Sequence, residues 1–223
     1  NKPGMEEKKK KIIEAVNEFI KNEYAKKIRT EELETRESDG PIRYLSMQIV
    51  FRDDKPLPRP VFDASECTAD GKSLNSQLLP GPPNINDLVE VMIRFRSRPV
   101  ALVGDIKGMF LAIGLADGKD SHRFVWRELD PSRDVEHYKL QVVTFGVTDS
   151  PFKSVETTKH HADENKSEYP LGHDLLKNDC YVDDLLGGKE TEEEAIKLFK
   201  EIDELLAKGG FKLMKVLSNS DLV

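Results

Sequence analysis

The chain has 223 residues, of which 38% are hydrophobic and 34% are charged, and its net charge is −7. This length suits one large domain or two interlocked subdomains, and the composition excludes a disordered chain. The two cysteines, Cys67 and Cys180, are too few for a disulfide framework or a zinc ligand set. With no apolar run of about 18 residues and no signal-peptide pattern, we expect no membrane role. The chain starts with Asn1, so we expect it to be excised from a longer protein.

An acidic net charge argues against a nucleic-acid partner, but the charge is unevenly distributed. Much of the acid lies in two helix-like segments, residues 5–34 and 191–206. The middle of the chain is instead rich in basic side chains: Arg52, Lys55, Arg59, Arg94, Arg96, Arg98 and Lys107. A local basic groove is therefore compatible with the overall charge.

Hydrophobic periodicity and turn signals predict a mixture of helices and strands. In chain order we expect helix 5–28, a polar linker 29–41, a hairpin within 43–62, a helix from 84, strand 100–103, a hairpin from 122–129 and 137–145, a helix from about 151, an acidic hairpin around 183, a helix from 191 to the glycines at 209–210, and strand 211–217.

Local signals mark the ends of two of these helices. Asn84 is the expected N-cap of the helix that follows it, and Thr191 with Glu194 forms a capping box. The helix after Asn84 has one expected apolar face, made of Ile85, Leu88, Val89, Met92 and Ile93. His160 and His161 are adjacent in a helix with no Glu or Cys to complete a ligand set, so we expect them at the surface.

The most informative motif is YVDDLLGG at residues 181–188. Successive strand residues point to opposite faces, so both carboxylates serve one site only if the chain turns there. We therefore expect a strand, a tight turn carrying Asp183 and Asp184, and a return strand. Asp105, which follows the strand 100–103, is the expected third acid. Such a group of acids suits divalent-metal phosphoryl transfer.

A strand with an acid, a helix, an acidic hairpin, a helix and a strand form the order of a split βαβ palm, an antiparallel sheet backed by helices. That order places Asp105 and Asp183 on neighbouring strands. Two carboxylates there can hold a pair of metal ions roughly 3.5 to 4 Å apart. Phosphoryl transfer depends mostly on positioning and charge neutralisation, so no nucleophilic side chain is needed.

Five ordered stretches resemble the reverse transcriptases of long-terminal-repeat retrotransposons, closest to the BEL/Pao group: RPVFDASECTADGKSLN, LVGDIKGMFLAIGL, TFGVTDSPF, YVDDLLGG and GGFKLMKVLSN. A lone Asp-Asp pair is a weak signal, whereas five blocks at the family's spacing are specific. The resemblance covers the chain from about residue 41 to its end, and the N-terminal helix fits it more loosely.

The resemblance implies an α+β right-hand polymerase fold that lacks a thumb and acts as an RNA-directed DNA polymerase, a nucleotidyltransferase. Fingers would comprise residues 41–82 and 114–148, and the palm 83–113 and 149–223, after an N-terminal helix and linker at 1–40. Primer grip, thumb, RNase H and integrase would belong to other regions of the Pol polyprotein. We therefore expect no processive synthesis by this stretch alone.

Catalytic roles follow from the resemblance for matching positions. Asp105 and Asp183 would be carboxylate ligands of two Mg²⁺ or Mn²⁺ ions. The backbone carbonyl of Ile106 would be a further ligand, and Asp184 a supporting catalytic acid. Lys215, or else Lys212, would protonate the departing pyrophosphate.

Nucleotide-binding roles are implied in the same way. Arg59 would bind the incoming triphosphate, for which its forked guanidinium is suited. Phe110 would be the steric gate that excludes a sugar 2′-hydroxyl, and Gly146 would allow a close approach of the backbone to nucleotide or template. Arg52 and Lys55 both fit the second cation of the fingers, and the choice between them stays open.

Phe145 is a departure from the family pattern, because many retroviral relatives have Gln before this glycine. A stacking or packing contact would then replace an amide hydrogen bond. The implied partners are an RNA template, a primer–template duplex, deoxynucleoside triphosphates and the remaining Pol regions. The implied location is a cytoplasmic retroelement particle or the nucleus.

Two other functions stay open at this point. A non-catalytic or domesticated palm-like module would bind nucleic acid or a protein partner, as the missing thumb and the acidic charge suggest. A metal-dependent phosphohydrolase would keep the acids, but it does not explain Arg59, Phe110 or the glycine block.

Overall fold

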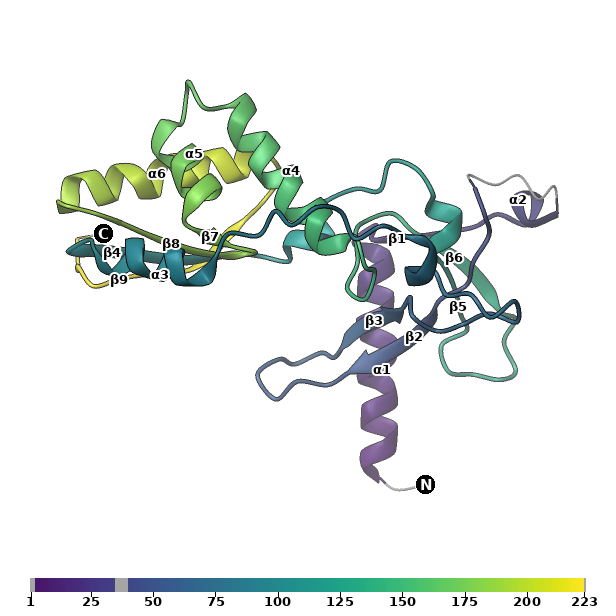
Figure 1. Cartoon of the computed structure of the whole chain (residues 1–223). Coiled ribbons are helices and arrows are strands. Elements are labelled where there is room, and N and C mark those ends of the chain that lie inside the picture. The colour runs from purple at the N-terminus through teal and green to yellow at the C-terminus, as the bar shows by residue number, and fades with distance from the viewer. Residues whose placement is uncertain (1–2, 35–39, 223) are drawn as a thin grey trace. The chain divides into compact units, whose positions relative to one another are not determined.

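The structure is a computed structural model that describes residues 3–34 and 40–222. It is a mixed α/β fold in which the strands of each sheet are antiparallel (Figure 1). The chain forms two compact units. The first contains the described residues of Asn1–Pro80 and Gly114–Ser150, and the second those of Gly81–Ile113 and Pro151–Val223. Each unit is thus assembled from segments that are distant in sequence.

The first unit contains two small sheets. Strands β2 (Ser46–Val50) and β3 (Arg59–Asp63) form the hairpin predicted around the proline-bounded turn. The second sheet has the order β1-β6-β5, in which β5 (Arg123–Trp126) and β6 (Glu136–Leu140) form the other predicted hairpin and β1 (Ala25–Lys27) adds to the edge of β6.

Strand β1 shows that the prediction of one helix over 5–28 is wrong at its C-terminal end. Helix α1 covers Pro3–Lys21, and Glu23 then has a left-handed φ of 60°. Pairing of the next residues with β6 overrides a helical periodicity that they also satisfy. The linker 29–41 contains a short helix, α2 (Thr30–Glu34), and its residues 35–39 lie outside the described residues.

Aromatic rings join α1 to both sheets of the first unit. Phe62 of β3 lies between Phe19 of α1 and Phe124 of β5, with ring centroids 5.7 and 5.0 Å apart. Phe124 in turn stacks on Tyr138 of β6 at 5.3 Å. These distances are typical of favourable aromatic pairs, and Phe62 and Phe124 are almost fully buried. The rings form the centre of this unit's core.

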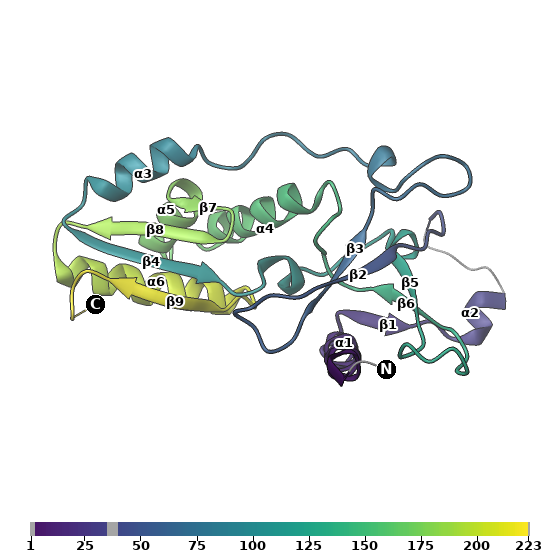
Figure 2. The same ribbon diagram turned by 90° about the horizontal axis from the view of Figure 1, so that it is seen from below.

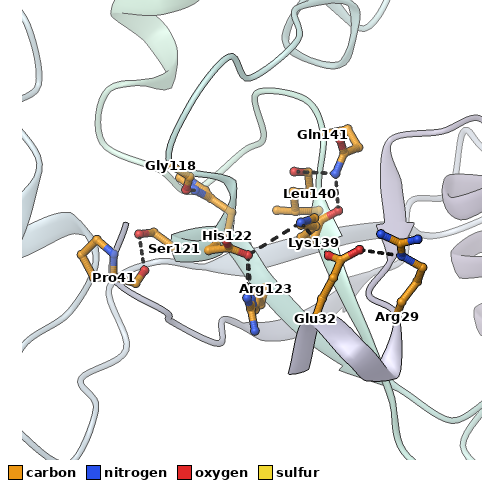
Figure 3. Close-up of polar contacts among 11 residues, drawn as sticks. Arg29, Glu32, Pro41, Gly118, Ser121, His122, Arg123, Lys139, Leu140 and Gln141 are labelled. Atoms are coloured by element: carbon orange, nitrogen blue, oxygen red, sulfur yellow. Dashed lines mark hydrogen bonds and ion pairs between the residues drawn. The ribbon is translucent and has the colours of Figure 1, made fainter. Parts of the chain in front are cut away.

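A buried ion pair joins strand β5 to the 3₁₀ helix that precedes it (Figure 3). Arg123 donates from Nε and Nη2 to Oδ1 of Asp120, at 2.9 and 2.7 Å, and both side chains are 3% exposed. Lys139 of β6 lies 4.0 Å from the same oxygen and donates to Glu32 of α2 at 3.2 Å. Buried charges need such partners because they have lost their hydration. The network therefore ties α2 and the 3₁₀ helix η3 (Lys119–His122) to the sheet.

The second unit is built on a four-stranded antiparallel sheet of order β7-β8-β4-β9 (Figure 2). Its strands are β4 (Val100–Ile106), β7 (Cys180–Tyr181), β8 (Asp184–Lys189) and β9 (Leu213–Ser218). Helices α4 (Ser150–Glu164), α5 (Pro170–Asn178) and α6 (Glu192–Lys208) lie on one side of this sheet (Figure 1). A Cβ on Gly187 of β8 would lie 2.8 Å from Leu175 of α5, so this glycine permits the close contact between sheet and helices.

Helix α6 begins where its sequence predicts. The Thr191 side chain accepts a hydrogen bond from the backbone N–H of Glu194, as expected for the capping box. Its predicted apolar stripe is largely buried, at Ala195, Leu198, Ile202, Leu205 and Leu206. His160 is exposed as expected, whereas His161 is half-buried and its Nε2 contacts the carbonyl oxygen of Leu205 at 2.7 Å. His161 thereby satisfies a carbonyl at the end of α6.

Helix α3 (Leu88–Arg96) corrects two predictions. Its N-cap is Asp87, not Asn84, because the Asp87 carboxylate accepts from the N–H groups of two residues in the first turn, at 2.8 and 3.1 Å. Its predicted apolar face is largely exposed: Val89 and Ile93 are 67% and 64% exposed, and Val91 is the buried residue. Within the described residues no helix has the length and apolarity needed to span a bilayer.

Candidate active site

The acidic motif forms a hairpin with a two-residue turn. Tyr181 of β7 pairs with Asp184 of β8, so the turn consists of Val182 and Asp183. The prediction that both acids lie in the turn is wrong, since Asp184 is already the first residue of β8. Val182 has a φ of 58°, a conformation for which such turns usually employ glycine. A β-branched residue there indicates local strain of the kind found at functional sites.

Strand β4 brings Asp105 to this hairpin. Asp105 pairs in register with Asp184, and the N–H of Ile106 donates to the main-chain carbonyl of Asp183 at 2.9 Å. The three acids predicted for the site therefore lie at the same end of one sheet. Their convergence depends on the pairing of β4 with β8, which joins segments about 80 positions apart.

Asp183 is the most perturbed of these acids. It is half-buried, and burial raises the pKa of Asp183 above its usual value. The negative charges of Asp184 and Asp105 raise this pKa further, whereas Lys215 lowers it. Like charges repel each other strongly where they are partly removed from water, and a bound cation would reduce that repulsion.

We expect Asp183→Asn to stabilise the metal-free protein at pH 7. Because the folded-state pKa of Asp183 is raised, its contribution to stability is complete below the unfolded pKa and is lost as the pH rises through the folded pKa. The neutral amide avoids that loss, and the gain should be about 1 kcal/mol or less, since the side chain is partly solvated. Thermal unfolding in EDTA should show the gain at pH 7 and a smaller one at pH 3; equal melting temperatures at pH 7 would contradict it.

Lys215 reaches the acids from β9, the strand that pairs with β4 on the side opposite β8. Its Nζ lies 2.8 Å from Oδ2 of Asp105, and this hydrogen bond raises the pKa of Lys215. Strand β9 bulges opposite Gly104, and Lys215 sits in the bulge with a left-handed φ of 54°. Bulges change the direction in which a side chain points. Of the two lysines considered for proton donation, the structure thus places Lys215 at the acids.

Three of the predicted residues in the first unit lie together: Arg59, Phe145 and Gly146. The Arg59 guanidinium lies over the ring of Phe145, 4.6 Å from its centroid, in cation–π geometry. Gly146 has a φ of 96°, and a Cβ on it would lie 2.4 Å from the carbonyl oxygen of Phe62. The close approach that requires glycine is therefore made by the protein's own backbone.

Asn75 is a residue of this group that the sequence reasoning missed. Its Nδ2 donates to the carbonyl of Gly146 at 2.8 Å and to Oγ of Ser65 at 2.9 Å. Its Oδ1 accepts from the N–H of Thr148 at 2.8 Å. Asn75 therefore holds the loop that carries Gly146. The available signal was its place at the end of the first matching block, RPVFDASECTADGKSLN.

The surroundings of the other predicted residues, Phe110, Arg52 and Lys55, do not test their nucleotide-binding roles. Phe110 lies in the 3₁₀ helix η2 (Met109–Ala112), which is the next element after β4, and is half-buried. Arg52 and Lys55 lie 3.9 and 3.7 Å from the same carboxylate, that of Asp54, so their geometry does not separate them. In the part of the chain that the structure describes, no three His, Cys, Asp or Glu side chains are arranged as a ready-made metal site.

No protein-family model matches the chain, and no curated protein matches it. Among solved structures it is similar to a foamy viral protease–reverse transcriptase determined in complex with double-stranded DNA, with a TM-score of 0.64 and 16% sequence identity. The fold resembles that of a reverse transcriptase. The likeness covers 91% of this chain and 30% of the viral chain, so the chain spans less than a third of that protein. The predicted combination of helices with antiparallel sheets is confirmed. The division into palm and fingers, the BEL/Pao assignment and the roles of single residues stay predictions.

Proposed function

We propose that the chain is the catalytic core of an RNA-directed DNA polymerase, the fingers and palm of a BEL/Pao-like retrotransposon reverse transcriptase. The convergence of Asp105, Asp183 and Asp184 at one end of a sheet carries the proposal. The reverse-transcriptase-like fold supports it. In this assignment the second unit is the palm and the first unit contains the fingers.

The acids fit a divalent cation by their donor chemistry. Carboxylate and carbonyl oxygens are the ligands that Mg²⁺ prefers, and the mutual repulsion that raises the pKa of Asp183 favours a cation beside it. Asp105, Asp183 and the backbone carbonyl of Ile106 would hold two Mg²⁺ or Mn²⁺ ions, with Asp184 in support. Such ions, when bound, neutralise the phosphates and activate the primer hydroxyl.

The other side chains act on the nucleotide in this proposal. Lys215, protonated at neutral pH and 2.8 Å from Asp105, supplies a proton to the leaving pyrophosphate. Arg59, stacked on Phe145, binds the triphosphate through its guanidinium. Phe110, four positions after the last residue of β4, excludes the sugar 2′-hydroxyl and thereby selects deoxynucleotides.

Primer extension tests the proposal. The purified chain, given an oligo(dT) primer on a poly(rA) template, should incorporate labelled dTTP in the presence of Mg²⁺ or Mn²⁺ and stop on addition of EDTA. Incorporation that persists without metal would contradict it. Release of phosphate from dTTP without a primer would favour a phosphohydrolase instead.

The second candidate is a non-catalytic module that binds nucleic acid or another region of Pol. The net charge of −7 favours the form that binds another region of Pol, because an acidic protein repels phosphates. The form that binds nucleic acid would bind primer–template with a steep salt dependence, and both forms would incorporate nothing under any metal condition.

A further inference from the structure

The strand that precedes the acidic turn has little support from the sheet. Strand β7 contains Cys180 and Tyr181, and among the described residues it pairs with β8 alone. Tyr181 and Asp184 form the pair that closes the turn. Hydrogen-bonded and non-hydrogen-bonded pairs alternate along an antiparallel ladder, so the next pair, Cys180 with Leu185, is of the type without hydrogen bonds. The following pair is bonded again, from the N–H of Leu186 to the carbonyl of Asp179 at 2.9 Å. The Cys180 carbonyl therefore points away from β8, toward the outer edge.

Asn86, in the segment before α3, binds that outer carbonyl. Its Nδ2 donates to the Cys180 carbonyl oxygen at 2.8 Å, and its Oδ1 accepts from Nζ of Lys159 in α4 at 2.9 Å. An ammonium group can only donate, so Lys159 fixes which end of the amide faces the hairpin. Lys159 also donates to the main-chain carbonyl of Asn84 at 2.8 Å, which holds it at the same segment.

Lys159 is not an ordinary solvated lysine. It is partly buried, and this burial, together with the charge of Lys177, lowers its pKa. Removing an ammonium group from water costs free energy unless hydrogen bonds replace the lost hydration. The carbonyl oxygen of Asn84 and the amide oxygen of Asn86 provide that replacement. The lysine and the segment before α3 therefore stabilise each other.

We propose that Asn86 and Lys159 are positioning residues for the acidic turn. Lys159 orients the Asn86 amide, and the amide holds the edge of β7, which keeps Asp183 beside Asp105. Neither residue is among those that would touch metal or nucleotide. The expected effect on metal binding rests on the proposed function. The claim that Asn86 and Lys159 support the hairpin does not rest on it.

The experiment compares the whole chain as wild type, Asn86→Ala, Lys159→Met and Lys159→Arg. Lys208→Met is the matched control, because Lys208 also makes a short bond within the second unit, 2.7 Å to Glu168. Hydrogen–deuterium exchange of the metal-free protein follows the backbone amides of residues 180–186. The bond from Asn86 to the Cys180 carbonyl is removed in Asn86→Ala, and in Lys159→Met the Asn86 amide loses the partner that orients it. Both substitutions should speed this exchange about five- to tenfold. Lys159→Arg should restore part of the protection, and Lys208→Met should match the wild type.

The second measurement is a Mn²⁺ titration followed by electron paramagnetic resonance. Only the Mn²⁺ binding that is lost in Asp183→Asn is evaluated, so that binding elsewhere on the protein does not contribute. The Mn²⁺ concentration for half-saturation should rise severalfold in Asn86→Ala and Lys159→Met, because a loosened turn holds its carboxylate less well. The control should again match the wild type.

Three outcomes overturn the inference: unchanged exchange at the hairpin, faster exchange throughout the second unit, and faster hairpin exchange with unchanged Mn²⁺ half-saturation. The second outcome would mean that the substitutions lower the stability of the whole second unit. The third would mean that Asn86 and Lys159 support β7 without any effect on metal binding. A wild type that neither binds Mn²⁺ nor extends a primer would overturn the proposed function instead. Exchange at the hairpin would then decide alone whether the pair holds β7.

Discussion

Asp105→Asn and Asp183→Asn should each lower the rate of primer extension at least about a thousandfold. Each substitution removes one negative charge while it preserves the shape of the side chain. The loss is large because the acids act as a unit on the charge of the metal ions, and no nucleophilic side chain compensates. Single-nucleotide incorporation on poly(rA)·oligo(dT), measured over a range of Mg²⁺ and Mn²⁺ concentrations, provides the rates.

Two controls separate chemistry from folding in that experiment. Asp203→Asn, at an exposed position of α6, should extend primers at the wild-type rate. Asp183→Asn is itself expected to melt no lower than the wild type, so unfolding would not account for its lost activity. Extension by Asp183→Asn at the wild-type rate would refute the assignment of the acidic hairpin as the catalytic centre.

Asp120→Ala should lower the free energy of unfolding by about 3 to 5 kcal/mol. The substitution leaves the guanidinium of Arg123, which is 3% exposed, without its main carboxylate partner. Urea unfolding can be followed by the fluorescence of Trp126, which is the single tryptophan of the chain and lies three residues after Arg123 on the same strand.

A surface pair and a double variant complete that test. Glu7→Ala removes the exposed ion pair with Lys11, whose Nζ lies 3.0 Å from the Glu7 carboxylate, and should cost less than about 0.5 kcal/mol. Asp120→Ala combined with Arg123→Leu should recover much of the lost stability, because the unpaired buried charge is then gone. A cost for Asp120→Ala as small as that for Glu7→Ala would show that the buried pair contributes little.

Elements with strong local signals could be predicted from the sequence. The hairpins β2–β3 and β5–β6 follow from apolar runs bounded by turn residues, and α6 from its capping box, its stripe and its terminal glycines. Ends and faces that depend on neighbours could not. Helix α1 stops before residue 28 because β6 pairs with the residues that follow, and α3 exposes Val89 and Ile93 although their spacing is that of a buried face.

The same division applies to the candidate site. The chemical identity of its acids was determined by the sequence alone, since Asp105 and the YVDD tetrapeptide carry their meaning in residue type and order. Their joint position was decided by the tertiary structure, through the pairing of β4 with β8. The bulge that turns Lys215 toward Asp105 and the bonds from Lys159 through Asn86 to the hairpin were decided there too. Such contacts join residues that are 70 to 110 positions apart, and local periodicity has no information about which distant segments will meet.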